Sequence, residues 1–126
     1  MVLTTGVDLI ELDRIGKLIE RYGDRVLQRV FTPAELEYCR GRVPELAARL
    51  AVKEAVAKAL GIGLRMMSPD GVAWRDVETL PDDNGKPILH LSGRAAERAA
   101  ELGLAQWSLS LSHGRDIAVA FIVAVG

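Results

Sequence analysis

Apolar residues are spaced differently in the two halves of the chain. Between residues 12 and 60 they recur mostly every three or four positions, which is the spacing of amphipathic helices. From residue 72 onward, short segments either alternate between apolar and polar positions or are apolar throughout, and both patterns are typical of strands. Residues 2–10 also have a strand pattern, which is expected to end near Asp8. The sequence therefore predicts one strand, a run of helices, and further strands with one more helix among them.

Local signals set the boundaries of the predicted helices. Gly23-Asp24 is expected to interrupt the helical pattern of residues 12–30, because glycine weakens a helix. The sequence TPAE at 32–35 has the form of a capping box, with its threonine as the N-cap and its proline in the first turn. The next helix is expected over 44–60, since two glycines follow it.

A hairpin signal stands in the second half of the chain. Asn84-Gly85 is a dipeptide typical of tight turns, and it separates the strand-like residues 72–80 from the strand-like residues 88–91. Ser92 is expected to cap a helix over residues 93–102. This segment therefore predicts a strand, a turn, a second strand and a helix.

The last two strands predict the fold class. Residues 107–113, WSLSLSH, place large side chains on one face and three serines on the other. Residues 117–125 are apolar on both faces, so they are expected to form a central strand. Strands and helices do not alternate regularly, which favours the α+β class with a mainly antiparallel sheet packed with helices. With 126 residues, a single domain covering residues 1–126 is expected.

Composition narrows the classes of partner and location. The net charge is −1, with 49% hydrophobic and 26% charged residues, so neither nucleic acid nor a membrane surface is expected as a partner. The longest apolar run, residues 117–125, is much shorter than the roughly 20 residues of a membrane-spanning helix. No basic-then-apolar leader opens the chain, and the single cysteine, Cys39, cannot form an internal disulfide. A cytoplasmic location is therefore expected.

A stripe of basic residues is predicted on the first helix. It consists of Arg14, Lys17, Arg21 and Arg25, spaced by three or four residues, and Arg29 would extend it. Because the whole chain is slightly acidic, this charge is local and would attract an acidic protein partner. A solvated polar face is the alternative interpretation.

The alanine-rich helix at residues 48–63 carries four charged side chains. Glu54 and Lys58 are one turn apart among small apolar neighbours, which indicates either a surface ion pair or the floor of a concave site. Arg49 and Lys53 are expected to lie together on a polar edge of this helix.

Asp8 is the second candidate for a functional carboxylate. An acid within an apolar strand is costly to bury unless it has a partner, although a turn or capping aspartate is the alternative. Together with Glu54 and Lys58 it would suit Mg²⁺ bound to a phosphate, since Mg²⁺ typically takes one or two protein carboxylates and keeps several waters. For His113, by contrast, an exposed or hydrogen-bonded strand-end histidine is the more frequent explanation, and the residues around Lys86 are by default only a hairpin turn.

Five segments, taken in order, carry a resemblance to a known family. They are GVDLIELDRI, FTPAELEYC, RLAVKEAVAKALGIG, DNGKP and LSLSHGRDIAVAFIV. The chain resembles the holo-[acyl-carrier-protein] synthases, the short bacterial 4′-phosphopantetheinyl transferases, over nearly its whole length. The most specific feature is the combination of G-[IV]-D, K-E-A-x-x-K-A and S-x-S-H. The resemblance implies a 4′-phosphopantetheinyl transferase fold.

The resemblance also implies an activity and a catalytic set. Such enzymes transfer the phosphopantetheine arm of coenzyme A to a serine hydroxyl of apo acyl carrier protein and release adenosine 3′,5′-bisphosphate. Asp8 and Glu54 would bind Mg²⁺ together with the diphosphate of coenzyme A, and Lys58 would contact the same phosphates. Lys58 would be a candidate for relaying the serine proton, and Glu54, directly or through a metal-bound water, would be the rival base.

A trimer with active sites between subunits is implied as well. The neighbouring subunit would hold the nucleotide end of coenzyme A through His113 and a turn, and Arg49 and Lys53 would also reach its phosphates. The turn residues are Asn84, Gly85, Lys86 and Pro87.

The same resemblance implies a binding partner for the basic stripe, namely the acyl carrier protein. The surface that receives the acidic helix of the carrier protein would be formed by Arg14, Leu18, Arg21 and Arg25.

Two other functions remain open at the level of sequence. A non-catalytic module could hold coenzyme A or a nucleotide diphosphate, but the presence of Asp8, Glu54 and Lys58 argues against it. A Mg²⁺-dependent hydrolase of nucleotide diphosphates would leave the basic stripe without a role.

Overall fold

The computed structural model describes residues 2–64 and 71–126. In chain order the elements are β1 (Leu3–Glu11), α1 (Leu12–Tyr22), α2 (Asp24–Val30), α3 (Pro33–Cys39), α4 (Val43–Leu60), the 3₁₀ helix η1 (Trp74–Asp76), β2 (Val77–Pro81), β3 (Pro87–Leu91), α5 (Gly93–Glu101), β4 (Gln106–His113) and β5 (Ile117–Val125). Among the helices described, none is both long and apolar enough to cross a membrane.

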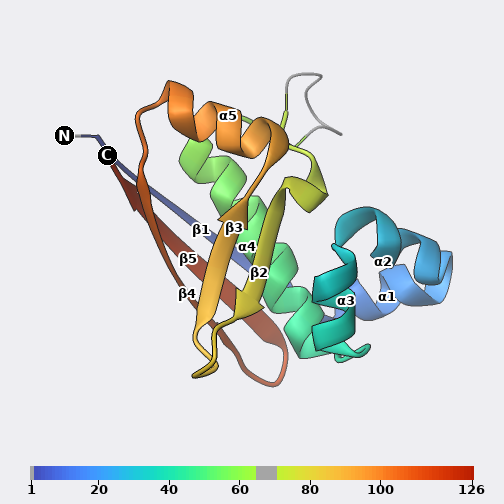
Figure 1. The fold of residues 1–126 in the computed structure, drawn as a ribbon. Coiled ribbons are helices and arrows are strands. Elements are labelled where there is room, and N and C mark those ends of the chain that lie inside the picture. Colours follow the sequence, from blue (N-terminus) through green and yellow to red (C-terminus); the bar gives the residue numbers. More distant parts are fainter. Residues whose placement is uncertain (1, 65–70) are drawn as a thin grey trace.

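The long strands form one antiparallel sheet in the order β1–β5–β4. The central place of β5 confirms the prediction made from its two apolar faces. β2 and β3 form a separate antiparallel hairpin around the predicted turn. Figure 1 shows α1, α2 and α3 gathered at one end of α4, while α4 runs along the long sheet. The arrangement is α+β with antiparallel sheets, as expected.

α4 is the central helix of the molecule and is buried nearly all round. It contacts β1 and β5 on one side, and β2 and α3 on another. Residues 46–53 are all buried, and the inner face of β5 presents mainly small side chains to the helix. At Gly6 the backbone of β1 is so close to α4 that an added Cβ would lie 2.0 Å from the carbonyl oxygen of Ala55. This close approach places the inner face of β1 directly against the functional helix.

Several predicted boundaries are confirmed. α1 ends at Gly23, and the hydroxyl of Thr32 accepts a hydrogen bond from the backbone N–H of Glu35 while the Glu35 side chain caps in return. α4 is followed by Gly61 in the left-handed region, with φ of 69°. These signals are local, which is why the sequence alone was sufficient to find them.

Three details differ from the predictions. β1 continues past Asp8 to Glu11, because its pairing with β5 extends to Ile117. The strand expected from residue 72 begins only at Val77, since residues 74–76 form the helical turn η1. Ser92 occupies the N-cap position of α5, but its side chain makes no capping hydrogen bond.

The outer face of the three-stranded sheet is uncovered in this chain, and it is largely apolar over β1 and β5, whereas β4 contributes serines to it. Large side chains that are exposed by 45–64% lie on β1 and β5. They are Leu3, Val7, Leu9, Ile117 and Phe121. Exposed apolar surface of this extent commonly marks an interface with another protein chain.

Candidate active site

Asp8 points from the middle of β1 toward α4. It shares the inner face of the strand with Gly6 and Ile10, and its side chain is only 13% exposed. The Nζ atom of Lys58 lies 2.7 Å from Asp8 Oδ1 and also donates to the carbonyl oxygen of Val7 at 3.0 Å. Lys58 of α4 thus holds the Asp8 carboxylate of β1 in place through these two bonds.

Glu54 lies one helical turn before Lys58 and is also largely buried. Its Oε1 atom accepts a hydrogen bond of 3.2 Å from Arg14 Nη2 on α1, and the Glu54 side chain is 18% exposed. Lys58 pairs with Asp8 rather than serving as the surface partner of Glu54. The structure therefore brings three elements, β1, α1 and α4, together around the two carboxyl groups.

The surroundings shift the pKa values of these two carboxyl groups in opposite directions. Burial by itself would raise the pKa of Asp8, but hydrogen bonds to Glu54 and Lys58 and the charge of Lys58 lower it below its ordinary value. Burial, followed by the hydrogen bond to Asp8 and its charge, raises the pKa of Glu54 to about 7, although Arg14 opposes this. A proton therefore stays between the two carboxyl groups up to nearly neutral pH.

One oxygen of this pair lacks a donor. Asp8 Oδ2 is buried and has no hydrogen-bond partner among the described residues. A protonated Glu54 could donate to this carboxyl group, whereas two carboxylates have no hydrogen to share. A divalent cation would replace that proton, and Mg²⁺ typically takes one or two carboxylates with water completing its shell. The donor set of Asp8 and Glu54 therefore fits Mg²⁺, and no cluster of three or more metal-ligating side chains was found in the described part of the chain.

A groove of about 760 Å³ opens beside the acid pair, between α1, α2 and α4. Its lining includes the four side chains expected to form the carrier surface: Arg14, Leu18, Arg21 and Arg25. These four residues therefore line one concave surface. Lys17 of the predicted stripe is absent from this lining and instead pairs with Asp13 at 2.9 Å.

Sequence reasoning missed part of the groove. Phe31 and Trp74 also line it, although they follow α2 and begin η1 respectively. Both are large apolar residues outside the helical stripe, and no spacing pattern connects them to α1. Their contribution depends on how distant segments fold onto one another.

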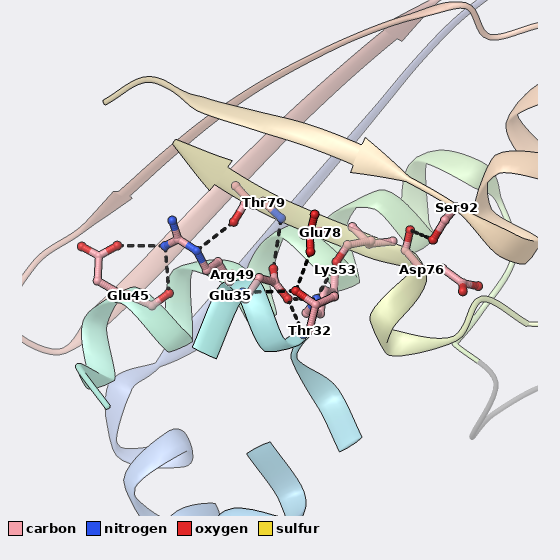
Figure 2. A network of polar contacts seen from close by, with 10 residues as sticks. Thr32, Glu35, Glu45, Arg49, Lys53, Asp76, Glu78, Thr79 and Ser92 are labelled. Atoms are coloured by element: carbon pink, nitrogen blue, oxygen red, sulfur yellow. Dashed lines mark hydrogen bonds and ion pairs between the residues drawn. The ribbon is translucent and has the colours of Figure 1, made fainter. Parts of the chain in front are cut away.

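The expectation that Arg49 and Lys53 lie on a polar edge of α4 is wrong. Their exposed fractions are 2% and 0%, because α3 and β2 cover this side of the helix. Lys53 pairs with Glu35 at 2.7 Å, and both side chains are fully buried. Figure 2 shows Arg49 and Lys53 extending from α4 toward β2. With no exposed surface, Lys53 does not fit the expected direct contact with a coenzyme A phosphate.

The remaining expected ligand contacts gather near the start of α4. Arg49 Nη1 lies 2.8 Å from Glu45 Oε2, and His113 Nε2 lies 3.5 Å from Glu45 Oε1. The turn of the β2–β3 hairpin is at the same end of the molecule as the turn between β4 and β5 (Figure 1). Nine residues separate Glu45 from Glu54, which is about 13 Å along a helix. One chain therefore holds two separate groups of candidate residues.

The turn itself is exposed and organised by one aspartate. Asp82 Oδ1 accepts hydrogen bonds from the backbone N–H groups of Asn84 and Lys86, at 2.8 and 2.9 Å. Gly85 has a φ of 84°, which a side chain would disfavour. The expected turn 84–87 is therefore a preformed, accessible loop.

Residues 4–122 match the family model of the 4′-phosphopantetheinyl transferase superfamily. The chain belongs to this superfamily. Within it, the match extends to the enzymes named holo-[acyl-carrier-protein] synthases, as the motifs indicated. The synthase of Herpetosiphon aurantiacus is 52% identical over 127 residues, which cover 99% of this chain and 100% of that protein. The synthase of Dehalococcoides mccartyi is 46% identical, over 98% of each chain.

Solved structures of the superfamily agree with the fold of this transferase. The holo-[acyl-carrier-protein] synthase of Neisseria meningitidis superposes with a TM-score of 0.85 at 35% identity, covering 98% of both chains. The Helicobacter pylori enzyme, solved in complex with coenzyme A, gives a TM-score of 0.83 at 26% identity and covers 96% of this chain and 99% of its own. The expected 4′-phosphopantetheinyl transferase fold is confirmed.

Proposed function

We propose that this enzyme transfers the 4′-phosphopantetheine group of coenzyme A to a serine hydroxyl of apo acyl carrier protein, releasing adenosine 3′,5′-bisphosphate. The observation that carries the proposal is the cluster of Asp8, Glu54 and Lys58, which Arg14 connects to an arginine-lined groove. Superfamily membership supplies the reaction class, and the cluster supplies groups suited to a diphosphate and a hydroxyl nucleophile.

Asp8 and Glu54 are proposed to hold Mg²⁺ with the diphosphate of coenzyme A. The support is the unpaired Oδ2 atom of Asp8 and the raised pKa of Glu54. Burial beside a second carboxyl group makes ionised Glu54 costly, and a bound cation would offset that cost. When bound there, the ion would neutralise negative charge that develops on the transferred phosphoryl group. Mg²⁺ binding requires an ionised Glu54, so affinity for the ion rises as the pH approaches and passes 7.

Lys58 is proposed to contact the phosphates of the substrate. Its side chain is 58% exposed while that of Asp8 is 13% exposed, so the ammonium group can turn from the carboxylate toward a ligand in solvent. Its positive charge then offsets charge on the departing phosphate. Two routes are proposed for the serine proton: Glu54 accepts it as the base, or Lys58 relays it by passing on one of its own protons as it takes the new one.

The groove beside α1 is proposed to receive the carrier protein. Arg14, Arg21 and Arg25 supply positive charge along its rim, while Leu18 and Leu50 add apolar lining. An acidic amphipathic helix complements such a surface in both charge and polarity. Arg14 also contacts Glu54, which connects the docking groove directly to the acid pair.

A homotrimer with sites between subunits is proposed as the working form. Two observations support it: the apolar outer face of the β1–β5–β4 sheet, and the separation of the candidate residues into two groups. Residues near the start of α4, with His113 and the hairpin turn, would complete the acid site of a neighbouring subunit. Arg49 is adjacent to His113 through Glu45, but its side chain is only 3% exposed, so His113 and the turn rather than Arg49 would contact the nucleotide.

The intact mass of an apo acyl carrier protein tests the proposal. The carrier is incubated with the enzyme, coenzyme A and Mg²⁺, and a parallel sample contains a chelator. The proposal predicts a mass increase of one phosphopantetheine that the chelator prevents. Cleaved coenzyme A with an unmodified carrier would instead establish a hydrolase. Bound but intact coenzyme A, with several different carriers left unmodified, would establish a non-catalytic binding module.

A further inference from the structure

A fully buried charged network joins α3 and α4 to the β2–β3 hairpin. Lys53 Nζ donates to Glu35 Oε1 at 2.7 Å and also to the carbonyl oxygen of Val77 in β2. The ring of buried Phe31 lies 5.5 Å from the same ammonium group. The catalytic set does not use this network, and its charges are not exposed to a ligand.

The network satisfies the outer edge of β2. Within the described part of the chain this strand pairs only with β3, so the backbone groups on its other edge need different partners. Glu35 Oε2 accepts from the N–H of Thr79 at 3.0 Å, and Arg49 Nε donates to the Thr79 carbonyl oxygen at 3.1 Å. With the Lys53 bond to Val77, three charged side chains stand where a neighbouring strand would be, as Figure 2 shows.

A further bond connects the start of α3 to the hairpin. The hydroxyl of Thr32 donates to Glu78 Oε2 at 2.6 Å, in addition to its capping role. Glu35 Oε1 meanwhile accepts from the backbone N–H of Thr32. The capping box of α3 is thus also an attachment point for β2.

The charged side chains of this network favour the interpretation that it positions β2 on α4. Apolar side chains of similar volume would often stabilise such a site as well or better, because burying an ion pair is costly. Charged hydrogen bonds differ from apolar packing in being directional, so they accept only one register of β2 against α4. Lys53 is adjacent in sequence to Glu54, and consecutive residues of a helix point about 100° apart. α4 therefore directs one side chain to the hairpin and the next to the acid pair.

We propose that Lys53 is a positioning residue that, with Glu35 and Arg49, fixes the β2–β3 hairpin on α4 so that its turn at residues 84–87 is held ready to bind coenzyme A. This inference rests on the proposed function, because it assigns the turn to substrate binding. It replaces the direct phosphate contact first expected for Lys53.

The test compares Lys53→Met, and the neutral pair Lys53→Met with Glu35→Gln, against Arg98→Met. The double variant avoids leaving a single buried carboxylate, so it is suitable if the single variant does not fold. Arg98 is the matched control: its Nε atom donates to the Leu60 carbonyl oxygen at 3.2 Å, so it too is a cation that bonds a backbone carbonyl. It belongs to α5, which lies at the opposite end of the molecule from the turn (Figure 1). Each protein is studied well below its own unfolding temperature.

Two measurements are made on every variant. Calorimetric titration with coenzyme A gives its Kd, and amide hydrogen exchange reports protection along residues 77–91. The proposal predicts that disrupting the network weakens coenzyme A binding by about tenfold or more, the loss expected for one charge-assisted hydrogen bond. It also predicts faster exchange of hairpin amides, an unchanged KM for the carrier, and wild-type values for Arg98→Met. In the wild-type protein, the Thr79 amide should be protected although it lies on a free strand edge.

The outcomes separate this inference from the proposed function. If the network variants only lose thermal stability and keep wild-type Kd and hairpin protection, Lys53 is merely structural and the inference is overturned. Rapid exchange of the Thr79 amide in the wild-type protein would overturn it as well. If the wild-type enzyme fails to transfer phosphopantetheine but the Kd and protection change as predicted, the transfer proposal fails and the positioning role remains.

Discussion

At the scale of single residues, Asp8 and Glu54 share one site but are treated differently by their surroundings. Lys58 lies beside Asp8 and favours its ionised form. Burial and the neighbouring Asp8 raise the pKa of Glu54, and the positive charge of Arg14 offsets this rise only in part. The folded protein therefore bears a cost whenever Glu54 ionises, which is typical of residues selected for function rather than for stability.

Removing that carboxylate is expected to stabilise the protein at alkaline pH. The folded-state pKa of Glu54 is about 7, above its ordinary value of 4.5, so the folded state binds more protons than the unfolded state between these values. The Glu54 contribution to the free energy of unfolding therefore falls as the pH rises through this interval. We expect Glu54→Gln to gain roughly 2–3 kcal/mol relative to wild type at pH 8 and much less at pH 4.5.

Chemical denaturation at the two pH values checks this prediction in metal-free buffer. Glu97→Gln is the control, because Glu97 is an exposed acid on α5 with a side chain 69% accessible to solvent. Equal free energies of unfolding for Glu54→Gln and wild type at pH 8 would contradict the pKa assigned to Glu54.

Sequence reasoning named Asp8, Glu54 and Lys58 as candidates but did not predict which side chains they would pair with. The spacing of Glu54 and Lys58 indicated two side chains on one face of a helix, which the structure confirms. Their actual partners, Arg14 and Asp8, come from segments 40 and 50 residues away in the chain. Such pairings depend on packing between distant segments, which no local pattern encodes.

At the scale of elements, the contact between β1 and α4 sets the geometry of the acid pair. Gly6 allows this contact, because any side chain there would meet the α4 backbone. Gly6→Ala is expected to lower the free energy of unfolding by about 1–3 kcal/mol through overpacking and to shift Asp8 away from Lys58. Transfer activity should fall together with stability.

Denaturant unfolding of Gly6→Ala and Gly16→Ala provides a matched comparison. Gly16 lies within α1, and a Cβ added there has no neighbouring atom within 4 Å. Alanine at this helical position should stabilise the protein by about 0.5–1 kcal/mol. If both substitutions had the same effect, close packing at Gly6 would not be the cause.

The arginines of α1 give an element-scale prediction about the carrier. Arg21→Ala should raise the KM for the carrier several-fold with little effect on the KM for coenzyme A, and added salt should reduce the difference from wild type. Arg21 is preferable to Arg14, which also contacts Glu54. Lys17→Ala is the control, since Lys17 is on the same helix but does not line the groove. An increase confined to the KM for coenzyme A would refute the docking assignment.

The elements were predicted where local chemistry determines them. The capping box at Thr32 and the break at Gly23 needed only neighbouring residues. Burial of Arg49 and Lys53 was not predictable in this way. A helical wheel identifies apolar faces, but it does not show that β2 would pack on this side of α4. Arg49 and Lys53 are buried there because they donate to backbone carbonyl oxygens on the unpaired edge of β2.

At the scale of the whole molecule, the exposed apolar side chains of β1 and β5 indicate that another protein surface covers the outer face of this sheet. If copies of this chain cover it, a charge placed there should prevent assembly, because burying an unpaired charge is costly. Phe121→Glu is expected to convert the proposed trimer to monomers and to abolish transfer. Size-exclusion chromatography with light scattering checks the mass.

Tyr22→Glu serves as the control for that experiment. Tyr22 is another exposed aromatic residue, but it lines the groove rather than the sheet face. This variant should keep the wild-type mass. A monomeric wild-type enzyme with full activity would contradict the proposal that subunits complete each other's sites.

The most direct test of the central claim is the rate of phosphopantetheine transfer by Glu54→Gln, measured by intact mass of the carrier with Glu97→Gln in parallel. The claim is that the Asp8, Glu54 and Lys58 cluster carries the reaction. It predicts a loss of at least about a hundredfold for Glu54→Gln, as removal of a metal ligand or catalytic base typically causes, and wild-type transfer for Glu97→Gln. Transfer by Glu54→Gln at the wild-type rate would contradict the claim.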